Sequence, residues 1–168
     1  QNGFIPRRSM FLNTRRLCHI LDNMTDMVDL PVALSLDIEK AFDTLGWDYL
    51  QSVLEHFGLG PNCLRWIKLL YRAPRARGRP VSDGFDIQRG TREGCPLSSI
   101  IFVLAMEPLA CHCRARKMEW GILEGGQTHV VSLYADDAIL YLCDSQQALP
   151  AVFQLLDRSG RVAGQRVN

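Results

Sequence analysis

The sequence predicts an α+β domain in which a β-sheet is layered with helices on one face. Two observations lead to this expectation. The segment 32–37 has the two-residue apolar period of a strand and lies between segments with helical periodicity. Near the C-terminus, the apolar run 130–142 is interrupted by two adjacent acids, which indicates a strand, a turn and a second strand.

The first half of the chain is expected to form a helix, a strand and two further helices. Ser9 can cap a helix that runs to about residue 24, with an apolar side made of Leu12, Leu17, Ile20, Leu21 and Met24. In the strand, even-numbered residues are apolar, whereas odd-numbered ones are small and end in Asp37, which leaves room for a ligand above the sheet. Helices follow over about 47–57, closed by Gly58, and from Pro61 to before Pro74.

The second half is expected to contain two hairpins separated by a long helix. Residues 81–88 fit a short hairpin around Asp83-Gly84. A long helix with an apolar first half follows over about 97–117, and Pro108 is a candidate kink in it. The hairpin with the two acids comes next, and a last helix covers about 146–159.

The composition is that of an ordinary globular domain and excludes few functions. Of the 168 residues, 47% are hydrophobic and 22% charged, and the net charge of +1 neither supports nor excludes a nucleic-acid partner. Basic residues are nevertheless clustered. Six lie between Arg65 and Ser82 without an acid, and a second group is Arg7, Arg8, Arg15 and Arg16. On charge alone, phosphate binding and a plain solvated surface both remain open.

Cysteine usage and hydropathy favour a reduced intracellular compartment. The six cysteines include no C-x-x-C pair, which argues against a structural zinc site. The sequence shows no signal peptide, and its longest apolar run, 100–106, is too short to span a bilayer. We therefore expect no membrane partner.

Three acids are expected to meet at one end of the sheet. Asp37 ends a strand, and Asp136 and Asp137 form the tip of the hairpin. If that strand lies beside the hairpin, the three carboxylates converge, and such like charges require a positive partner. Carboxylate oxygens suit Mg²⁺, which takes further ligands from substrate phosphates. Two such ions about 3.5–4 Å apart can hold both oxygens of a phosphoryl transfer.

At these residues the chain resembles the reverse transcriptases of non-LTR, LINE-type retrotransposons. Residues 35–43 (SLDIEKAFD) resemble the first catalytic motif, 89–98 (RGTREGCPLS) the motif that positions template and nucleotide, and 134–137 (YADD) the third motif. Residues 1–9 (QNGFIPRRS) resemble an upstream block of the same enzymes, and 159–168 the start of the motif after the hairpin. The resemblance covers essentially the whole chain.

The resemblance implies a polymerase palm with an antiparallel sheet, plus partial fingers, in a single domain over 1–168. The fingers would comprise about 1–30 and 45–95, and the palm about 31–44 and 96–168. The resemblance also implies an RNA-directed DNA polymerase in the nucleus or cytoplasm. It would act on an RNA template, a DNA primer and deoxynucleoside triphosphates. Because no thumb is encoded, we expect this fragment to be inactive, or nearly so, on its own.

The resemblance also implies a role for each matching residue. Asp37 and Asp136 would hold two Mg²⁺ or Mn²⁺ ions, with Asp137 assisting and the carbonyl of Ile38 as a further ligand. Phe42 would exclude a ribose 2′-hydroxyl, although a core aromatic is the alternative. The nucleotide site would further include Glu93, Gly94, Cys95 and Pro96. Template or phosphate contacts would come from Arg8, Arg72, Arg75, Arg77 and Arg92, each of which could instead be a surface arginine.

Three positions depart from the family pattern. Glu93 stands where glutamine is usual and would add repulsion near an incoming triphosphate. Ser99 stands where a second proline is common, and Arg7 where glycine is common, so that a positive φ there would cost energy. Two other hypotheses therefore remain open. The chain could be a binding module that holds RNA without catalysis, or a non-functional fragment that does not fold alone.

Overall fold

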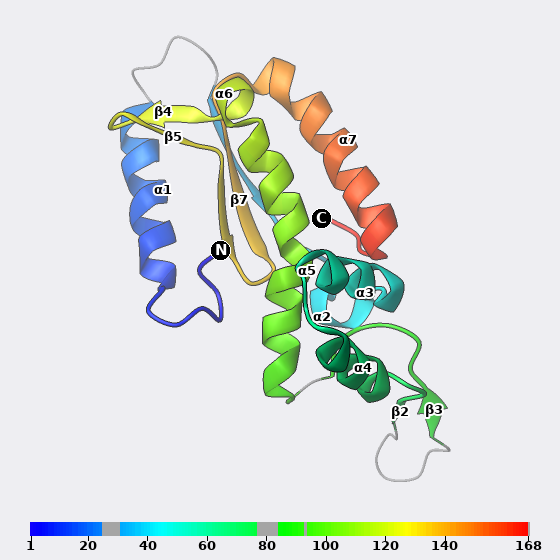
Figure 1. The fold of residues 1–168 in the computed structure, drawn as a ribbon. Helices are drawn as coiled ribbons and strands as arrows, with labels where there is room; N and C mark the ends of the chain where they lie inside the picture. The colour runs from blue at the N-terminus through cyan, green and yellow to red at the C-terminus, as the bar shows by residue number, and fades with distance from the viewer. Residues whose placement is uncertain (25–30, 77–83, 93, 168) are drawn as a thin grey trace.

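The computed structural model describes residues 1–24, 31–76, 84–92 and 94–167 (Figure 1). The helices are α1 (Met10–Met24), α2 (Ala41–Thr44), α3 (Trp47–His56), α4 (Pro61–Leu70), α5 (Pro96–Ala115), α6 (Lys117–Trp120) and α7 (Ser145–Ala163). The strands are β1 (Val32–Leu36), β2 (Arg75–Ala76), β3 (Phe85–Asp86), β4 (Ile122–Glu124), β5 (Gln127–His129), β6 (Val131–Tyr134) and β7 (Asp137–Leu142).

The central sheet is antiparallel and has the order β1-β7-β6. Leu36 pairs with Ala138, and Tyr134 pairs with Asp137 across a two-residue turn. The end of β1 is thereby placed beside the start of β7. The sheet confirms the α+β class, and it joins the strand that precedes Asp37 to the hairpin that carries the two acids.

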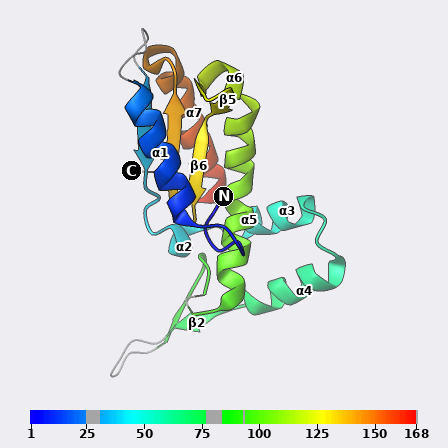
Figure 2. The ribbon, with the colours of Figure 1, turned by 90° about the vertical axis from the view of Figure 1, so that its left-hand side faces the viewer.

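Helices cover both faces of this sheet, whereas the sequence led us to expect them on one. On one face, Leu36, Leu133 and Leu140 pack with buried residues of α5 and α7. On the other, Tyr141 is fully buried against Ile20 of α1 and Ile122 of β4. Figure 2 shows α1 lying in front of the sheet. Burying one large apolar side chain contributes about 1.5–3 kcal/mol, so the contact between Ile20 and Tyr141 stabilises the packing of α1 on this face.

A second cluster of buried side chains joins α3 and α4 to the first half of α5. Leu50 and Leu54 of α3 pack with Ile67 of α4 and with Ile101 and Phe102 of α5. This cluster continues into α2, which directly follows β1. The long helix α5 therefore connects the sheet with the α3–α4 region (Figure 1).

Most predicted elements are present, with local differences. Ser9 accepts a hydrogen bond from the Phe11 N–H at the start of α1, as expected. Leu17, Ile20 and Met24 face inward as expected, whereas Leu12 and Leu21 are exposed and Asn13 is buried on that side instead. The β4–β5 hairpin and the short helix α2 were not predicted.

The first expected hairpin has a different first arm. Its second arm, β3, pairs with Arg75–Ala76, and residues 81–83 with the expected Asp83 tip lie outside the described residues. Arg75 pairs with Asp86, so the two arms are farther apart in sequence than a tight turn allows.

The central helix α5 is, by length and composition, apolar enough to cross a membrane. In this fold it contacts α3 and β6 and buries Ile101, Phe102, Ala105 and Ala110 in the two clusters. The same composition is typical of the core helix of a globular fold, and α5 has that position in this structure.

Candidate active site

The candidate active site lies where β1 ends and the β6–β7 hairpin turns. The antiparallel register pairs Val32 with Leu142 and Leu36 with Ala138, so its next step places Asp37 opposite Asp137. Asp37 and Asp137 are both exposed, and their side chains share the face of the odd-numbered residues. Asp136 occupies the turn beside them. The three acids predicted to converge are thus carried to one end of one sheet.

The turn at the hairpin tip has a strained backbone. Ala135 has a φ of 55°, and Asp136 is not among the residues with positive φ, which is the pattern of a type II′ turn. That position favours glycine, and an alanine there costs about 1–2 kcal/mol. Such strain persists only where the surrounding structure holds it, which is common at functional sites.

The negative charges of Asp37, Asp136 and Asp137 lie close together at this site. Burial, then the charges of Asp136 and Asp37, raise the pKa of Asp137 above its ordinary value. The carboxylates therefore lie close enough to repel one another. A cation bound between them would relieve that repulsion.

The donor set suits a hard divalent cation, although no ion site is preformed. Among the residues that the structure describes, no three His, Cys, Asp or Glu side chains are already arranged to hold a metal ion. The acids nevertheless supply only carboxylate oxygens, and these are the ligands of Mg²⁺ and Mn²⁺. Ile38, expected to add its carbonyl, has a buried side chain and forms a backbone bridge with Val167.

Phe42, the expected ribose-excluding residue, lies between two other aromatic rings. It stacks on Phe102 of α5 with ring centroids 4.2 Å apart, and Phe4 meets it edge-on at 6.3 Å. Its backbone carbonyl accepts hydrogen bonds from the N–H and hydroxyl of Thr91, at 2.6 and 3.2 Å. Phe42 is half-buried, so it is partly a core aromatic and partly exposed to solvent.

Glycine is required where the loop of residues 89–92 crosses α2. Gly90 has a φ of 86°, and a Cβ on it would lie 2.6 Å from the Asp43 carbonyl oxygen. Its N–H donates to the Leu45 carbonyl, and its own carbonyl accepts from the Trp47 indole. This loop therefore fixes the residues that follow Asp37.

The remaining nucleotide-site residues lie at the start of α5. Gly94 has a φ of 72°, Cys95 precedes the helix, and Pro96 is its first residue. The Leu97 N–H is the main cause that lowers the pKa of the Cys95 thiol. Figure 1 shows the hairpin tip beside the middle of α5, so these residues are not brought directly against the acids. Glu93 lies outside the described residues.

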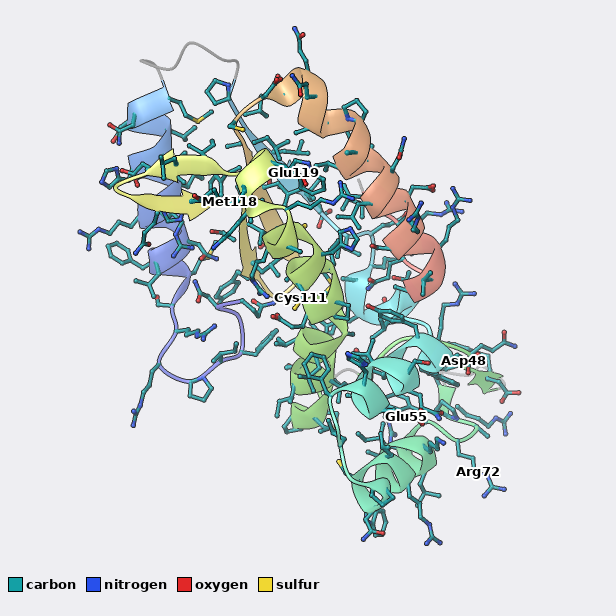
Figure 3. The ribbon with its side chains drawn as sticks, turned by 45° about the horizontal axis from the view of Figure 1, so that its top comes forward. Asp48, Glu55, Arg72, Cys111, Met118 and Glu119 are labelled. Carbon is teal, nitrogen blue, oxygen red and sulfur yellow. The ribbon has the colours of Figure 1, made fainter. Side chains whose placement is uncertain are left out.

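The predicted nucleic-acid arginines are spread over several elements. Arg8, Arg72 and Arg92 are exposed. Figure 3 shows Arg72 at the α4 end of the molecule, away from the sheet. Arg75 is used within its own hairpin, since it pairs with Asp86 at 3.2 Å and donates to the Gly84 carbonyl. Arg77 lies outside the described residues.

Comparison with known proteins assigns the fold to a family. All 168 residues match the model of the family described as "Reverse transcriptase (RNA-dependent DNA polymerase)". The chain belongs to the reverse transcriptase family. It is 34% identical, over 86% of its length, to the "Transposon TX1 uncharacterized 149 kDa protein" of Xenopus laevis.

Two type R2 retrotransposon polyproteins are also similar to this reverse transcriptase domain. The chain is 26% identical, over its whole length, to a "Retrovirus-related Pol polyprotein from type-1 retrotransposable element R2" of Popillia japonica. It is 26% identical over 84% of its length to the R2DM polyprotein of Drosophila melanogaster. The matched regions cover 11%, 24% and 13% of these three relatives. The non-LTR origin inferred from the motifs is thereby confirmed.

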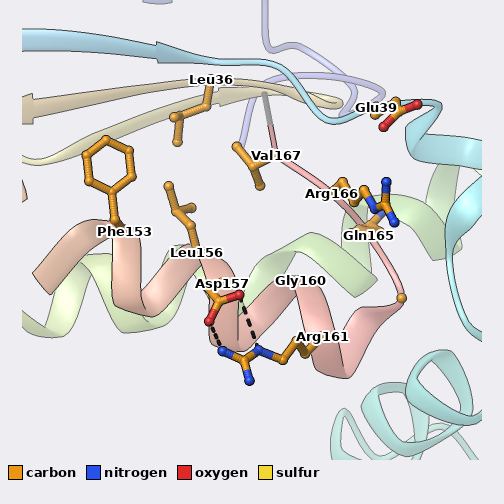
Figure 4. Close-up of a pocket in the computed structure, with 11 residues that line it drawn as sticks. Leu36, Glu39, Phe153, Leu156, Asp157, Gly160, Arg161, Gln165, Arg166 and Val167 are labelled. Carbon is orange, nitrogen blue, oxygen red and sulfur yellow. Dashed lines mark hydrogen bonds and ion pairs between the residues drawn. The ribbon is translucent and has the colours of Figure 1, made fainter. Parts of the chain in front are cut away.

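Reverse transcriptases are polymerases that generally depend on divalent metal ions and act on a nucleic-acid template, a primer and nucleotides. The palm-like sheet with its acids at one end agrees with that family. A large cavity lies apart from these acids. It measures about 760 Å³ and lies between β1, α7 and residues 164–167, where Asp157 and Arg161 form an ion pair (Figure 4). Leu36 lines it, and the adjacent Asp37 faces the other side of the sheet. The acids are therefore not part of this cavity.

Sequence reasoning missed several polar residues that support the reverse transcriptase site. Gln165 is buried and donates a hydrogen bond of 3.0 Å to the Ala41 carbonyl. The Arg166 carbonyl accepts from the Glu39 N–H at 2.9 Å, so residues 165–167 hold the segment after Asp37. Nothing local in the sequence marks these contacts, because they join residues more than a hundred positions apart.

Proposed function

We propose that this chain is the palm and partial fingers of a retrotransposon enzyme that copies RNA into DNA. Asp37 and Asp136 hold two divalent ions, with Asp137 assisting, and the chain adds deoxynucleotides to a primer 3′-hydroxyl. The observation that carries the proposal is the strand register, which brings Asp37 opposite Asp137 at the hairpin that also bears Asp136.

When bound, the two ions lower the pKa of the primer hydroxyl and neutralise the departing pyrophosphate. The protein's own part is mainly position and charge. Phe42, held by Thr91 and Phe102, narrows the space beside the sugar and favours a deoxyribose over a ribose. Gly94, Cys95 and Pro96 support the new base pair, and Arg8, Arg72 and Arg92 bind phosphates of the nucleic acid.

Replacement of one carboxylate tests the proposal. In the full-length protein, Asp136→Asn should lower primer extension on an RNA template by a factor of a thousand or more, because an amide oxygen does not supply the charge that the ions need. Gln127→Ala, at an exposed position on β5, serves as the control and should leave extension unchanged. Unchanged incorporation by Asp136→Asn would contradict the metal role.

A second candidate function is nucleic-acid binding without catalysis. The observation that favours it is the basic surface of α4, where Arg65, Lys68 and Arg72 surround an exposed Trp66. Titration with Mn²⁺ and with a single-stranded RNA separates the two candidates. Ion binding that is lost in Asp37→Ala supports the polymerase. RNA binding without any Mn²⁺ binding supports the module.

A further inference from the structure

The side chain of Gln1 grips the backbone of the strained residue in the catalytic turn. Its Nε2 donates to the Ala135 carbonyl at 3.2 Å, and its Oε1 accepts from the Ala135 N–H at 3.0 Å. A side-chain amide is suited to this because it can donate and accept at the same time. Ala135 is the residue whose φ is 55°, so both polar groups of the strained residue are satisfied by one side chain.

Two asparagines hold the strand that leads into the turn. β6 lies at the edge of the sheet, and its Leu133 carbonyl accepts from the Asn2 N–H at 2.8 Å. The same carbonyl accepts from the Asn13 amide at 3.1 Å, and the Asn2 amide in turn donates to Asn13. Asn13 is 6% exposed, so a polar side chain occupies a buried position of α1 in order to make this contact.

Gly3 lets the N-terminal segment approach the turn this closely. A Cβ on Gly3 would lie 2.4 Å from the Ala135 nitrogen and 3.1 Å from its Cα, and backbone atoms cannot move aside easily. The Gly3 N–H also donates to Gln1 Oε1 at 2.8 Å, which orients the amide. The next residue, Phe4, meets Phe42 edge-on. The segment 1–4 therefore contacts both the turn with the acids and the aromatic beside the expected sugar site.

We propose that residues 1–4 and Asn13 form a clamp that holds the Ala135 turn in its strained conformation, with Gln1 as a positioning residue for Asp136 and Asp137. This proposal rests on the function proposed above. Without the clamp, the turn would relax from the left-handed φ of Ala135, and the two acids would lose their common orientation. The clamp fixes the carboxylates before the ions bind, so that ion binding need not order the turn.

Removing the amide tests the clamp. In the full-length protein, Gln1→Met keeps the length of the side chain and removes both hydrogen bonds. We expect Mn²⁺ affinity, measured by the decrease of the free-ion EPR signal, to fall by about tenfold, as for other groups that orient metal ligands. Gln127→Met, the same change at an exposed position of β5, should leave the affinity unchanged.

Glycine at the turn distinguishes positioning from a general structural effect. Ala135→Gly removes the strain at positive φ. The double variant Gln1→Met/Ala135→Gly should therefore recover most of the Mn²⁺ affinity lost in Gln1→Met. Wild-type affinity in Gln1→Met, or no recovery in the double variant, would overturn the clamp.

Amide hydrogen exchange separates failure of the clamp from failure of the proposed function. The Ala135 N–H is bonded to Gln1 Oε1, so in the absence of metal Gln1→Met should speed its exchange about tenfold or more. If wild type binds no Mn²⁺, the metal proposal is wrong, and accelerated Ala135 exchange would still support the clamp. Unchanged exchange in Gln1→Met would overturn it.

Discussion

Three of the five non-glycine residues with positive φ among the described residues lie at or near the candidate site. Ala135 is in the turn, Phe4 is in the segment 1–4 that contacts it, and Arg7 follows three residues later, with φ values of 55°, 56° and 64°. Arg7 stands where the family resemblance led us to expect glycine, and its positive φ confirms the expected conflict. The side chain of Arg7 is exposed, so little is gained there to offset the strain.

Arg7→Gly should therefore stabilise the protein. Relief of the left-handed conformation should raise the free energy of unfolding by about 1–2 kcal/mol. The greater conformational freedom of glycine in the unfolded chain offsets part of this gain. We expect a net gain of about 0.5–1 kcal/mol, measured by urea unfolding. Arg15→Gly, within α1, should instead destabilise by about 1 kcal/mol. A loss of stability in Arg7→Gly would show that the arginine side chain makes a contribution larger than its strain.

Among the elements, those with a clear period could be predicted from the sequence. β1 alternates between apolar and small residues, and β6–β7 is an apolar run broken by two acids, so both were located closely. β4 and β5 are three residues each, too short to establish a period, although Gly125-Gly126 between them is a common hairpin turn. The sequence predicted that Asp37 meets the hairpin acids only if the strand 32–37 lies beside that hairpin. The register that meets this condition pairs Leu36 with Ala138 and places the even-numbered residues of both strands on the face covered by α5 and α7.

The contacts that hold the Ala135 turn could not be predicted from local patterns. Asn13 lies on the same face of α1 as Leu17, Ile20 and Met24, but the period does not tell that its side chain reaches Leu133, 120 positions away. Gln1 and Ala135 are similarly remote. Polar side chains that satisfy backbone groups across elements carry no period of their own, so only the tertiary structure reveals them.

The β6–β7 hairpin carries a charge conflict that should make its stability depend on pH. Because burial and two acidic neighbours raise the pKa of Asp137, the folded state binds a proton there more tightly than the unfolded state does. Asp137 therefore favours folding below its unfolded pKa, near the ordinary value of 3.8, and that contribution is lost as the pH rises through the raised folded value.

Asp137→Asn should accordingly raise the melting temperature at pH 7 without divalent ions, by a few degrees at most because the side chain is exposed. The difference from wild type should shrink as the pH falls below the ordinary value of 3.8, where Asp137 becomes protonated in both states. Adding Mg²⁺ at pH 7 should also reduce it, since the cation relieves the repulsion in wild type. Calorimetric scans at both pH values provide the measurement, and a melting temperature lowered at pH 7 would be the contrary result.

Across the whole molecule, exposed aromatic and basic side chains cluster at the α4 end, away from Asp37, Asp136 and Asp137. One face of α4 presents Trp66, which is 66% exposed, together with Asn62, Arg65, Lys68, Leu69 and Arg72 around a depression of about 700 Å³. Lys68 also approaches Glu55 of α3 at 4.0 Å, an exposed pair of little strength. An aromatic ring among cations is the arrangement that binds single-stranded nucleic acid, by stacking on a base and attracting phosphates.

Trp66 offers a direct measurement of such binding, because it is far more exposed than the other tryptophans. Trp120 is 4% exposed, and Trp47 is half-buried with its indole N–H bonded to Gly90. If an oligouridylate stacks on α4, it should quench tryptophan fluorescence, and Trp66→Phe should remove that quenching.

Trp66→Ala should weaken binding of the oligouridylate about tenfold or more, as loss of one stacked base does, whereas Phe153→Ala, at an exposed aromatic of α7, should not. Affinity should also fall with salt, since phosphate contacts release counterions. Quenching that persists in Trp66→Phe would instead place the nucleic acid near Trp47, whose indole N–H is bonded to the Gly90 carbonyl.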